Sequence, residues 1–355
     1  MKDNKYADIG VVKTVEAKEL NSNTTCVKYF PEIDVIRCLG MFLVVLGHSF
    51  PDASNNGGIQ IPFWRFVFNY IYSFHMPLFF TIAGFVSYRF LTTSEDKNQH
   101  IMKRMMRLLL PYLVWALIYI PFKLILVKYT SATFEWKNLW KIIIGNNPYS
   151  GLWFLYALFI IDLLRTLLID NEKKERVYFV ASFILLLTAK HSTIEEPIRW
   201  IFAYSFYYSL GYEIRRRYLD IEKICKNVVV IIFPAFIIFA LTYFVDFENP
   251  FHGVSSIVSS ISGIIMMFGI GLKLRNRNIL REIGKYSMDI YILSGVFLVI
   301  LRITLYTKMH MGYDLYVVVA TAISFFLPIF VSKQIIRRNR FLSLVLLGDT
   351  SGISK

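Results

Sequence analysis

Charged residues are scarce in this sequence. Only 18% of its 355 residues are Asp, Glu, Lys or Arg, whereas 55% are hydrophobic and 17% are aromatic. A soluble domain of this length typically has about a quarter charged residues. Apolar stretches near the length of a membrane-spanning helix, about 20 residues, recur along the whole chain. The composition therefore argues against a soluble protein and predicts an integral membrane protein.

Cysteine is also rare, and the three cysteines are Cys26, Cys38 and Cys225. An odd number with scattered spacing indicates neither a disulfide framework nor a metal site. We therefore expect no metal site. We also expect no bound cofactor.

The first 30 residues lack the apolar region and the small-residue cleavage site of a signal peptide. They are polar and of mixed charge, so we expect residues 1–30 to form a cytoplasmic tail. A membrane domain of residues 31–335 should follow. The remaining residues, 336–355, should form a second cytoplasmic tail. Its short amphipathic stretch, Phe341 to Leu347, is expected to lie on the inner membrane surface.

The apolar pattern predicts an all-α bundle of about ten membrane-spanning helices, without an internal repeat or a soluble domain. The expected spans are residues 32–50, 66–90, 106–127, 152–170, 176–190, 197–214, 227–246, 253–273, 286–306 and 314–333.

The net charge of +14 could indicate a nucleic-acid partner, but the distribution of the charge argues against one. Lys and Arg cluster in the short segments between apolar stretches, and most of them fall on one side if the spans alternate. Membrane proteins retain Lys and Arg on the cytoplasmic side. The pattern therefore predicts a multi-pass protein of the plasma (inner) membrane, with both termini in the cytoplasm and the lipid bilayer as its partner.

Ionisable residues enter the first span. Its uninterrupted apolar part, Cys38 to Gly47, covers only about 15 Å, half of a hydrocarbon core of about 30 Å. At 100° per residue, Arg37 and His48 lie within about 20° of the same helix face, and Asp34 lies within about 40° of it. Because ionisable residues at such depth are costly, this face is expected to line a cavity or to contact a partner.

His48 is the candidate catalytic residue, because an imidazole can accept a proton near neutral pH. The alternative is that His48 ends the helix and forms hydrogen bonds with solvent; the face it shares with Arg37 favours the functional reading. Asp34 is the second catalytic candidate. Asp34 could orient Arg37, but it lies about 21 Å from His48 along an ideal helix and could reach it only if the helix were distorted.

The second span contains His75 near the middle of the membrane, close to Pro77. We predict His75 as a possible residue of the site lining. A structural histidine, bonded to a neighbouring helix, is the more favoured alternative. Pro77 should free a backbone carbonyl, which other groups must then satisfy.

The third span opens with Arg104 and Arg107, which share a helix face on the cytoplasmic side. Paired guanidinium groups suit phosphate or pyrophosphate recognition. Anchoring of the helix by the positive-inside pattern is the alternative, and for a basic pair alone it is the preferred one.

Together these residues resemble the acyltransferase-3 family of membrane O-acyltransferases. The resemblance covers residues 30 to 335. Its motifs are Asp34, Arg37 and His48 in the first span; Phe74-His75-Met76-Pro77-Leu78-Phe79-Phe80 with Gly84 in the second; Arg104 and Arg107; Trp153-Phe154-Leu155; Gly211; and the segment from Ile283 to Ile292.

The resemblance implies transfer of an acyl group, commonly acetyl from acetyl-CoA, to a hydroxyl of a cell-surface sugar or exopolysaccharide. It implies His48 as the catalytic residue and Arg37, Arg104 and Arg107 as donor-binding residues, with Trp153 a possible residue of the site lining. The expected partners are an acyl-CoA, a carbohydrate acceptor and polysaccharide-assembly proteins. One departure is that Ser294 stands after Ile290-Tyr291-Ile292-Leu293, where many relatives have a histidine.

Two other functions are compatible with the residues. A transporter or flippase of a polysaccharide precursor would use Asp34, Arg37 and His48 to line a substrate path, with discontinuous helices in two repeated halves. A structural subunit of a polysaccharide-assembly complex would instead keep the face of His48 packed and dry, without a cavity between the first three spans.

Overall fold

The computed structural model describes residues 29–53, 58–88, 96–125, 136–191, 195–218, 228–245 and 254–350. Within these residues all regular secondary structure is helical. The α-helices are α1 (Pro31–Ser49), α2 (Pro62–Ser87), α4 (Lys97–Arg104), α5 (Leu110–Ile125), α6 (Trp153–Leu168), α7 (Glu172–His191), α8 (Ile198–Arg216), α10 (Val228–Val245), α11 (Val254–Leu274), α12 (Asn278–Gly284), α13 (Ser287–Leu301), α14 (Tyr313–Gln334) and α15 (Arg340–Leu347).

Shorter helical segments of other types extend or join these helices. Two are π-helices, η1 (Met105–Leu109) between α4 and α5 and η5 (Arg302–Lys308) after α13. Three are 3₁₀-helices, η3 (Trp136–Ile142), η4 (Ser150–Leu152) and η6 (Ile336–Arg338).

The all-α prediction is confirmed for the described residues, and each expected span falls on a helix. Five helical segments are long and apolar enough to cross a membrane by length and composition: Pro62–Ser87, Lys97–Ile125, Ser255–Leu274, Ser287–Lys308 and Tyr313–Arg338. The count of ten crossings and the side on which each terminus lies stay predictions.

Helix α1 falls outside that group of five because Glu32, Asp34 and Arg37 lie in its first two turns. All three side chains have partners inside the protein. Tyr218 donates a 2.6 Å hydrogen bond to Glu32, and Arg37 pairs with Asp34. The polar turns of the helix are therefore satisfied by protein groups.

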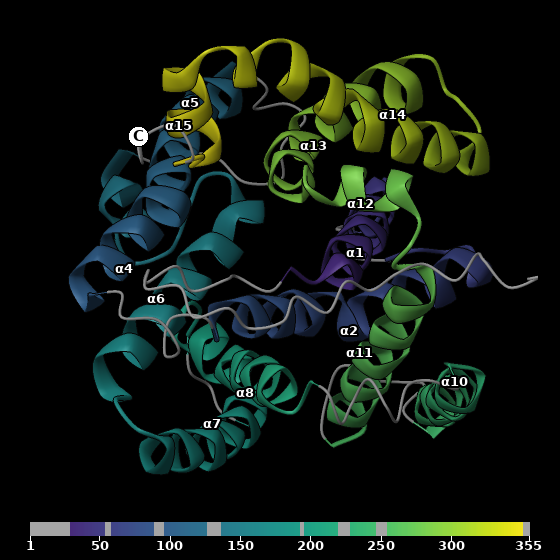
Figure 1. Ribbon diagram of the computed structural model, residues 1–355. Helices are drawn as coiled ribbons and strands as arrows, with labels where there is room; N and C mark the ends of the chain where they lie inside the picture. Colours follow the sequence, from purple (N-terminus) through teal and green to yellow (C-terminus); the bar gives the residue numbers. More distant parts are fainter. Residues whose placement is uncertain are drawn as a thin grey trace, which may run out of the picture.

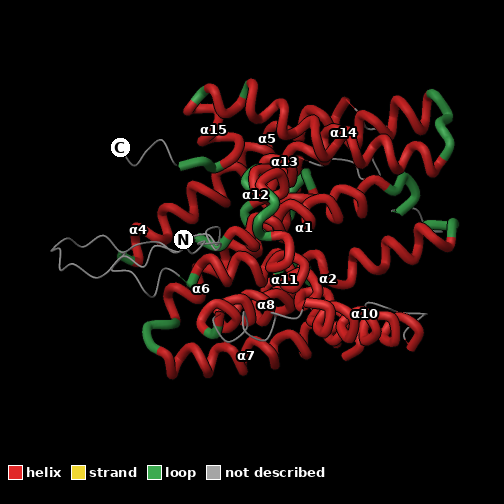
Figure 2. The backbone as a smooth tube through the Cα atoms, turned by 45° about the vertical axis from the view of Figure 1, so that its right-hand side comes forward, coloured by secondary structure: helices red, strands yellow, loops and turns green. Residues whose placement is uncertain are grey.

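Helices α1 and α2 lie in the middle of the molecule. In Figures 1 and 2, α13 and α14 lie on one side of this pair, and α8, α10 and α11 lie on the other. Many large apolar side chains are exposed on the outer helices, among them Phe233 and Leu241 of α10 and Phe326 and Phe330 of α14. Such a surface fits a lipid environment, because lipid tails are as apolar as these side chains.

Two glycines let α2 and α8 approach closely. A Cβ atom on Gly84 would lie 1.9 Å from the carbonyl oxygen of Tyr208, and one on Gly211 would lie 1.8 Å from that of Thr81. Small residues permit such close crossings of membrane helices. Any larger side chain at either position would push the two helices apart.

Pro77 lies inside α2 and has no N–H group to donate to the carbonyl of Ser73. The hydroxyl of Ser260 in α11 lies 2.7 Å from that carbonyl oxygen and 2.7 Å from the carbonyl oxygen of Ser256 in its own helix, so its one hydrogen is shared between the two. The prediction that Pro77 frees a backbone carbonyl is confirmed, and the replacement bond joins α2 to α11.

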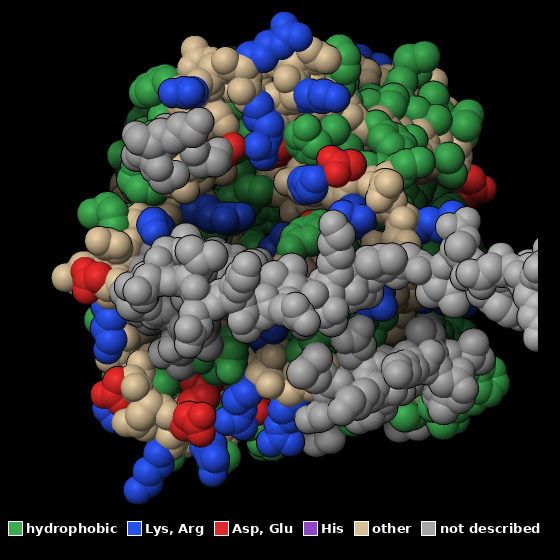
Figure 3. Space-filling model, viewed as in Figure 1, with side chains coloured by type: hydrophobic (Ala, Val, Ile, Leu, Met, Phe, Trp, Pro, Cys, Tyr) green, Lys and Arg blue, Asp and Glu red, His purple; other side chains and the backbone are tan. Residues whose placement is uncertain are grey.

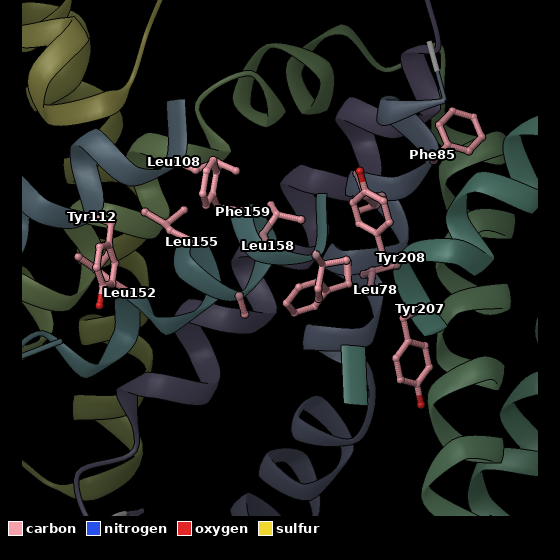
Figure 4. Packing of buried hydrophobic residues seen from close by; sticks show 14 of the residues in the cluster. Leu78, Phe85, Leu108, Tyr112, Leu152, Leu155, Leu158, Phe159, Tyr207 and Tyr208 are labelled. Atoms are coloured by element: carbon pink, nitrogen blue, oxygen red, sulfur yellow. The ribbon is translucent and has the colours of Figure 1, made fainter. Parts of the chain in front are cut away.

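Aromatic and aliphatic side chains fill the contact between η1, α5 and α6. Figure 4 shows Leu108, Tyr112, Leu155 and Leu158 in this part of the core. The hydroxyl of Tyr112 donates a 2.8 Å hydrogen bond to the backbone carbonyl of Ile142, so its buried polar end is satisfied.

The amphipathic stretch near the C-terminus forms helix α15. Asn339 caps the start of this helix, because its side chain accepts hydrogen bonds from two backbone N–H groups of the first turn. The indole of Trp115 in α5 donates a 2.9 Å hydrogen bond to the carbonyl of Leu346. The helix packs on α5, and its expected place on the inner membrane surface stays a prediction. The expected tail of residues 1–30 lies almost entirely outside the described residues.

Candidate active site

A large cavity of about 1560 Å³ lies inside the bundle. Its wall extends along α13 from Ser287 to Arg302 at the start of η5, a distance of about 22 Å at 1.5 Å per residue. The cavity therefore runs through much of the thickness of the bundle. Six of the predicted site residues line it, namely Arg37, His48, His75, Arg104, Arg107 and Trp153.

His48 lies near the C-terminal end of α1, and its side chain is exposed to the cavity. Its Nδ1 atom is 3.4 Å from the hydroxyl of Tyr72, and the two rings meet edge to face at 6.0 Å. No other hydrogen-bonding partner of His48 occurs among the described residues. One ring nitrogen is thus held by Tyr72, which leaves Nε2 available to a molecule in the cavity.

His75 is buried in α2, and its Nδ1 donates a 2.8 Å hydrogen bond to the carbonyl of Ile71. The structural alternative predicted a bond from His75 to a neighbouring helix. The bond is instead made within α2. The ring of Tyr72 lies edge-on to His75 at 4.8 Å. His75 therefore supports Tyr72, which in turn contacts His48.

Trp153 begins α6 and, with Tyr204, forms an aromatic wall of the cavity, against which other aromatic rings pack from behind. Its ring centroid is 4.8 Å from that of Trp200 and 5.3 Å from that of Tyr204. Phe80 stacks on Tyr204 at 4.5 Å. This wall is largely apolar, so it shapes the cavity without adding charge to it.

Asp34 does not line the cavity. Its carboxylate accepts a hydrogen bond from Arg37 at 3.1 Å and one from the hydroxyl of Tyr29 at 2.7 Å. Helix α1 is unbroken between Asp34 and His48, so about 21 Å separates them along its axis. The geometry assigns Asp34 the task of orienting Arg37, and the contact with His48 that a direct catalytic role would require is missing.

Arg104 is tied into a buried polar network. Its guanidinium lies 3.2 Å from a carboxylate oxygen of Asp162 and donates a 2.6 Å hydrogen bond to Ser87. Asp162 also contacts His100 at 2.9 Å and accepts a hydrogen bond from Tyr208. Arg104 therefore joins the end of α4 to α6 and α8 as well as facing the cavity.

Removal of the acidic member of this network should make the protein unfold more readily. Asp162→Ala removes the carboxylate that pairs with the guanidinium of Arg104 and that also contacts His100 and Tyr208. Removal of one partner of a buried ion pair typically costs about 3–5 kcal/mol. Thermal unfolding of the purified protein in detergent should show a lower melting temperature. Asp170→Ala is the matched control, since Asp170 is exposed and its ion pair is with the exposed Lys174, and it should leave the melting temperature unchanged. An equal effect of both substitutions would contradict the structural role of Asp162.

Arg107 is exposed to the cavity and forms no ion pair with a described residue. It lies in the π-helix η1. Such segments are rare and frequently occur at functional sites. Arg104 and Arg107, predicted as a pair, thus have different surroundings, and Arg107 is the one that is free to bind a ligand.

Two further cations, Lys285 and Arg337, line the cavity at the end where Arg37, Arg104 and Arg107 lie. Neither was predicted as a site residue. The hydrogen bond from Lys285 to Glu282 raises the pKa of the lysine, so Lys285 remains charged. Arg337 pairs with Asp289 at 2.9 Å. Figure 3 shows Lys and Arg side chains gathered around a hollow on this face of the molecule.

Lys123 and Arg302 line the opposite end of the cavity, and they were also missed. Both lie within expected spans, where an ionisable residue is itself a sign of function. The signal was therefore present in the sequence. In contrast, no group of side chains suited to a metal ion occurs among the described residues.

The model of the acyltransferase-3 family, an acyltransferase domain, matches residues 30–333. No curated protein and no solved structure matches the chain. The family match covers most of the chain and includes α1, α2 and η1, which supply candidate residues. The chain therefore belongs to the acyltransferase-3 family and is a membrane acyltransferase.

Proposed function

We propose that the protein transfers an acetyl group from acetyl-CoA to a hydroxyl of a cell-surface sugar or exopolysaccharide. The observation that supports this proposal is one continuous cavity with cations at one end and His48 further along it. A structural subunit would have no such cavity between the first three spans.

The end with Arg37, Arg104 and Arg107 suits the anionic part of the donor. Phosphate groups bind guanidinium groups through strong charge-assisted hydrogen bonds. Arg107 is free for such a bond, and Asp34 holds Arg37 in place. Along α1, His48 lies about 16 Å beyond Arg37, so the extended arm of the donor would carry its thioester along the cavity toward the imidazole.

His48 would act as the general base. It takes the proton of the acceptor hydroxyl as the hydroxyl oxygen attacks the thioester carbonyl. The carbon–sulfur bond then breaks, the acetyl ester forms on the acceptor, and the thiolate leaves and takes the proton from His48. The same position would also allow His48 to carry the acetyl group transiently as an acyl-enzyme.

The direction of transfer follows from where the substrates occur. Acetyl-CoA is made in the cytoplasm, so the end of the cavity with Arg37, Arg104 and Arg107 would face inward, in the plasma membrane with both termini inside. The acceptor would enter from the opposite end or from a lipid carrier, in cooperation with polysaccharide-assembly proteins.

Deletion of the gene tests the proposal. Acetyl esters of surface glycans should disappear and should return with the wild-type gene but not with His48→Ala, as measured by ester analysis of purified glycans. A transporter of a polysaccharide precursor predicts another outcome, in which the amount of surface glycan falls and the remaining glycan keeps its esters. That outcome would contradict the acyltransferase proposal.

A further inference from the structure

Arg302 stands out at the end of the cavity that lies beyond His48. It is the first residue of the π-helix η5, directly after α13, and its side chain lines the cavity. It lies near His48, Tyr119 and Tyr316. The two described π-helices thus each place an arginine in the cavity, Arg107 at one end and Arg302 at the other.

The charge of Arg302 is not neutralised within the described residues. It forms no ion pair there, and its buried Nε atom has no hydrogen-bond partner among them. The acidic side chains just after α1 and in the first turn of α14 have other partners. Asp52 accepts a 2.6 Å hydrogen bond from Tyr313, and Asp314 accepts one of 2.6 Å from the indole of Trp64.

A buried donor without a partner is costly, and a cation inside a membrane protein is more costly still. Retention of such a group is explained if a ligand supplies the missing acceptor. Lys123 adds a second positive charge to the same end of the cavity, and it likewise forms no ion pair with a described residue. The stacked rings of Tyr119 and Tyr149, 4.4 Å apart, form a flat amphipathic surface close by.

We propose that Arg302, together with Lys123, binds a negatively charged group of the acceptor, a carboxylate or a phosphate, while the acceptor hydroxyl lies at His48. The proposal rests on the proposed function and adds the chemical class of the acceptor. The planar guanidinium of Arg302 can hold either group through two parallel hydrogen bonds. Because Arg107 and its neighbours bind the donor at the other end, the two anionic substrates would approach His48 from opposite directions.

The test is a transfer assay with purified protein in lipid vesicles. Radiolabelled acetyl-CoA is supplied together with glycan and glycolipid fractions from the cells, separated by anion exchange into neutral and anionic pools. Wild-type protein should label the anionic pool. Arg302→Gln should raise the KM for that pool by about 10- to 100-fold, the loss expected for a charge-assisted bond, and should leave the KM for acetyl-CoA unchanged.

Lys308→Gln is the matched control, because Lys308 is a cation of the same π-helix that does not line the cavity, and its KM for the acceptor pool should equal that of the wild type. Arg302→Lys should bind the acceptor more tightly than Arg302→Gln but less tightly than the wild type, since lysine keeps the charge but lacks the planar guanidinium. Binding of acetyl-CoA to the Arg302→Gln protein with wild-type affinity serves as the control for correct folding.

Chemical treatment of the anionic pool distinguishes the two sources of charge. Reduction of carboxyl groups abolishes labelling if the group is a carboxylate, and phosphatase or mild acid abolishes it if the group is a phosphate. Labelling that survives both treatments, labelling of the neutral pool only, or an unchanged acceptor KM in Arg302→Gln would overturn the inference and leave the acyltransferase proposal intact. Failure of the wild-type protein to label any pool would overturn the acyltransferase proposal itself.

Discussion

His48→Ala protein should transfer acetyl groups at least about 100- to 10,000-fold more slowly than the wild type, the contribution typical of a positioned general base. The imidazole lies inside the cavity, with Tyr72 as its one hydrogen-bonding partner among the described residues, so its Nε2 atom is open to the acceptor. The measurement is the initial rate of transfer from radiolabelled acetyl-CoA to cell glycans in lipid vesicles. His48→Gln should be as inactive, because an amide cannot accept the proton.

Two controls separate catalysis from folding. His310→Asn replaces an exposed histidine outside the cavity, at a positive φ of 52° that asparagine tolerates, and it should retain wild-type activity. His48→Ala protein should bind acetyl-CoA as the wild type does. Wild-type rates in His48→Ala would remove His48 from the mechanism.

Arg107→Gln should raise the KM for acetyl-CoA by about 10- to 150-fold, which corresponds to loss of one charge-assisted hydrogen bond of roughly 1.5–3 kcal/mol. Arg107 has no ion-pair partner among the described residues. Its substitution therefore leaves no acidic side chain without its partner and should not destabilise the fold. The acceptor KM should stay the same. Titration of acetyl-CoA at saturating acceptor measures the effect.

Lys103→Gln is the matched control for Arg107, because Lys103 lies one turn away in α4 and does not line the cavity. It should leave the KM for acetyl-CoA at the wild-type value. Arg104→Gln should differ from both, since it also breaks the network of Asp162 and should lower the melting temperature. An unchanged KM for acetyl-CoA in Arg107→Gln would refute the assignment of the donor end.

Local features of the sequence were sufficient to predict where the helices lie. Apolar stretches near twenty residues located each expected span, because a helix in lipid must be apolar over its length whatever its neighbours are. The face shared by Arg37 and His48 was likewise predictable, since α1 is a regular helix and its geometry follows from spacing alone. Pro77 indicated a free carbonyl for the same local reason.

Contacts between distant segments could not be predicted in this way. Spacing placed Arg104 and Arg107 on one face, but only the fold brings Asp162 to Arg104 and leaves Arg107 unpaired among the described residues. The same holds for Ser260, which satisfies the carbonyl that Pro77 frees. In each case the partner lies on another helix, and the pairing depends on how the helices cross.

The sequence by itself determined that this is a helical membrane protein, and its motifs indicated the acyltransferase family and His48 as the candidate base. Only the tertiary structure decided which ionisable residues share one cavity. It left Asp34 outside that cavity and added Arg302 at the far end. The physical reason is that helix periodicity fixes the direction of a side chain, whereas close packing of helices such as α2 and α8 at their glycines fixes which side chains meet.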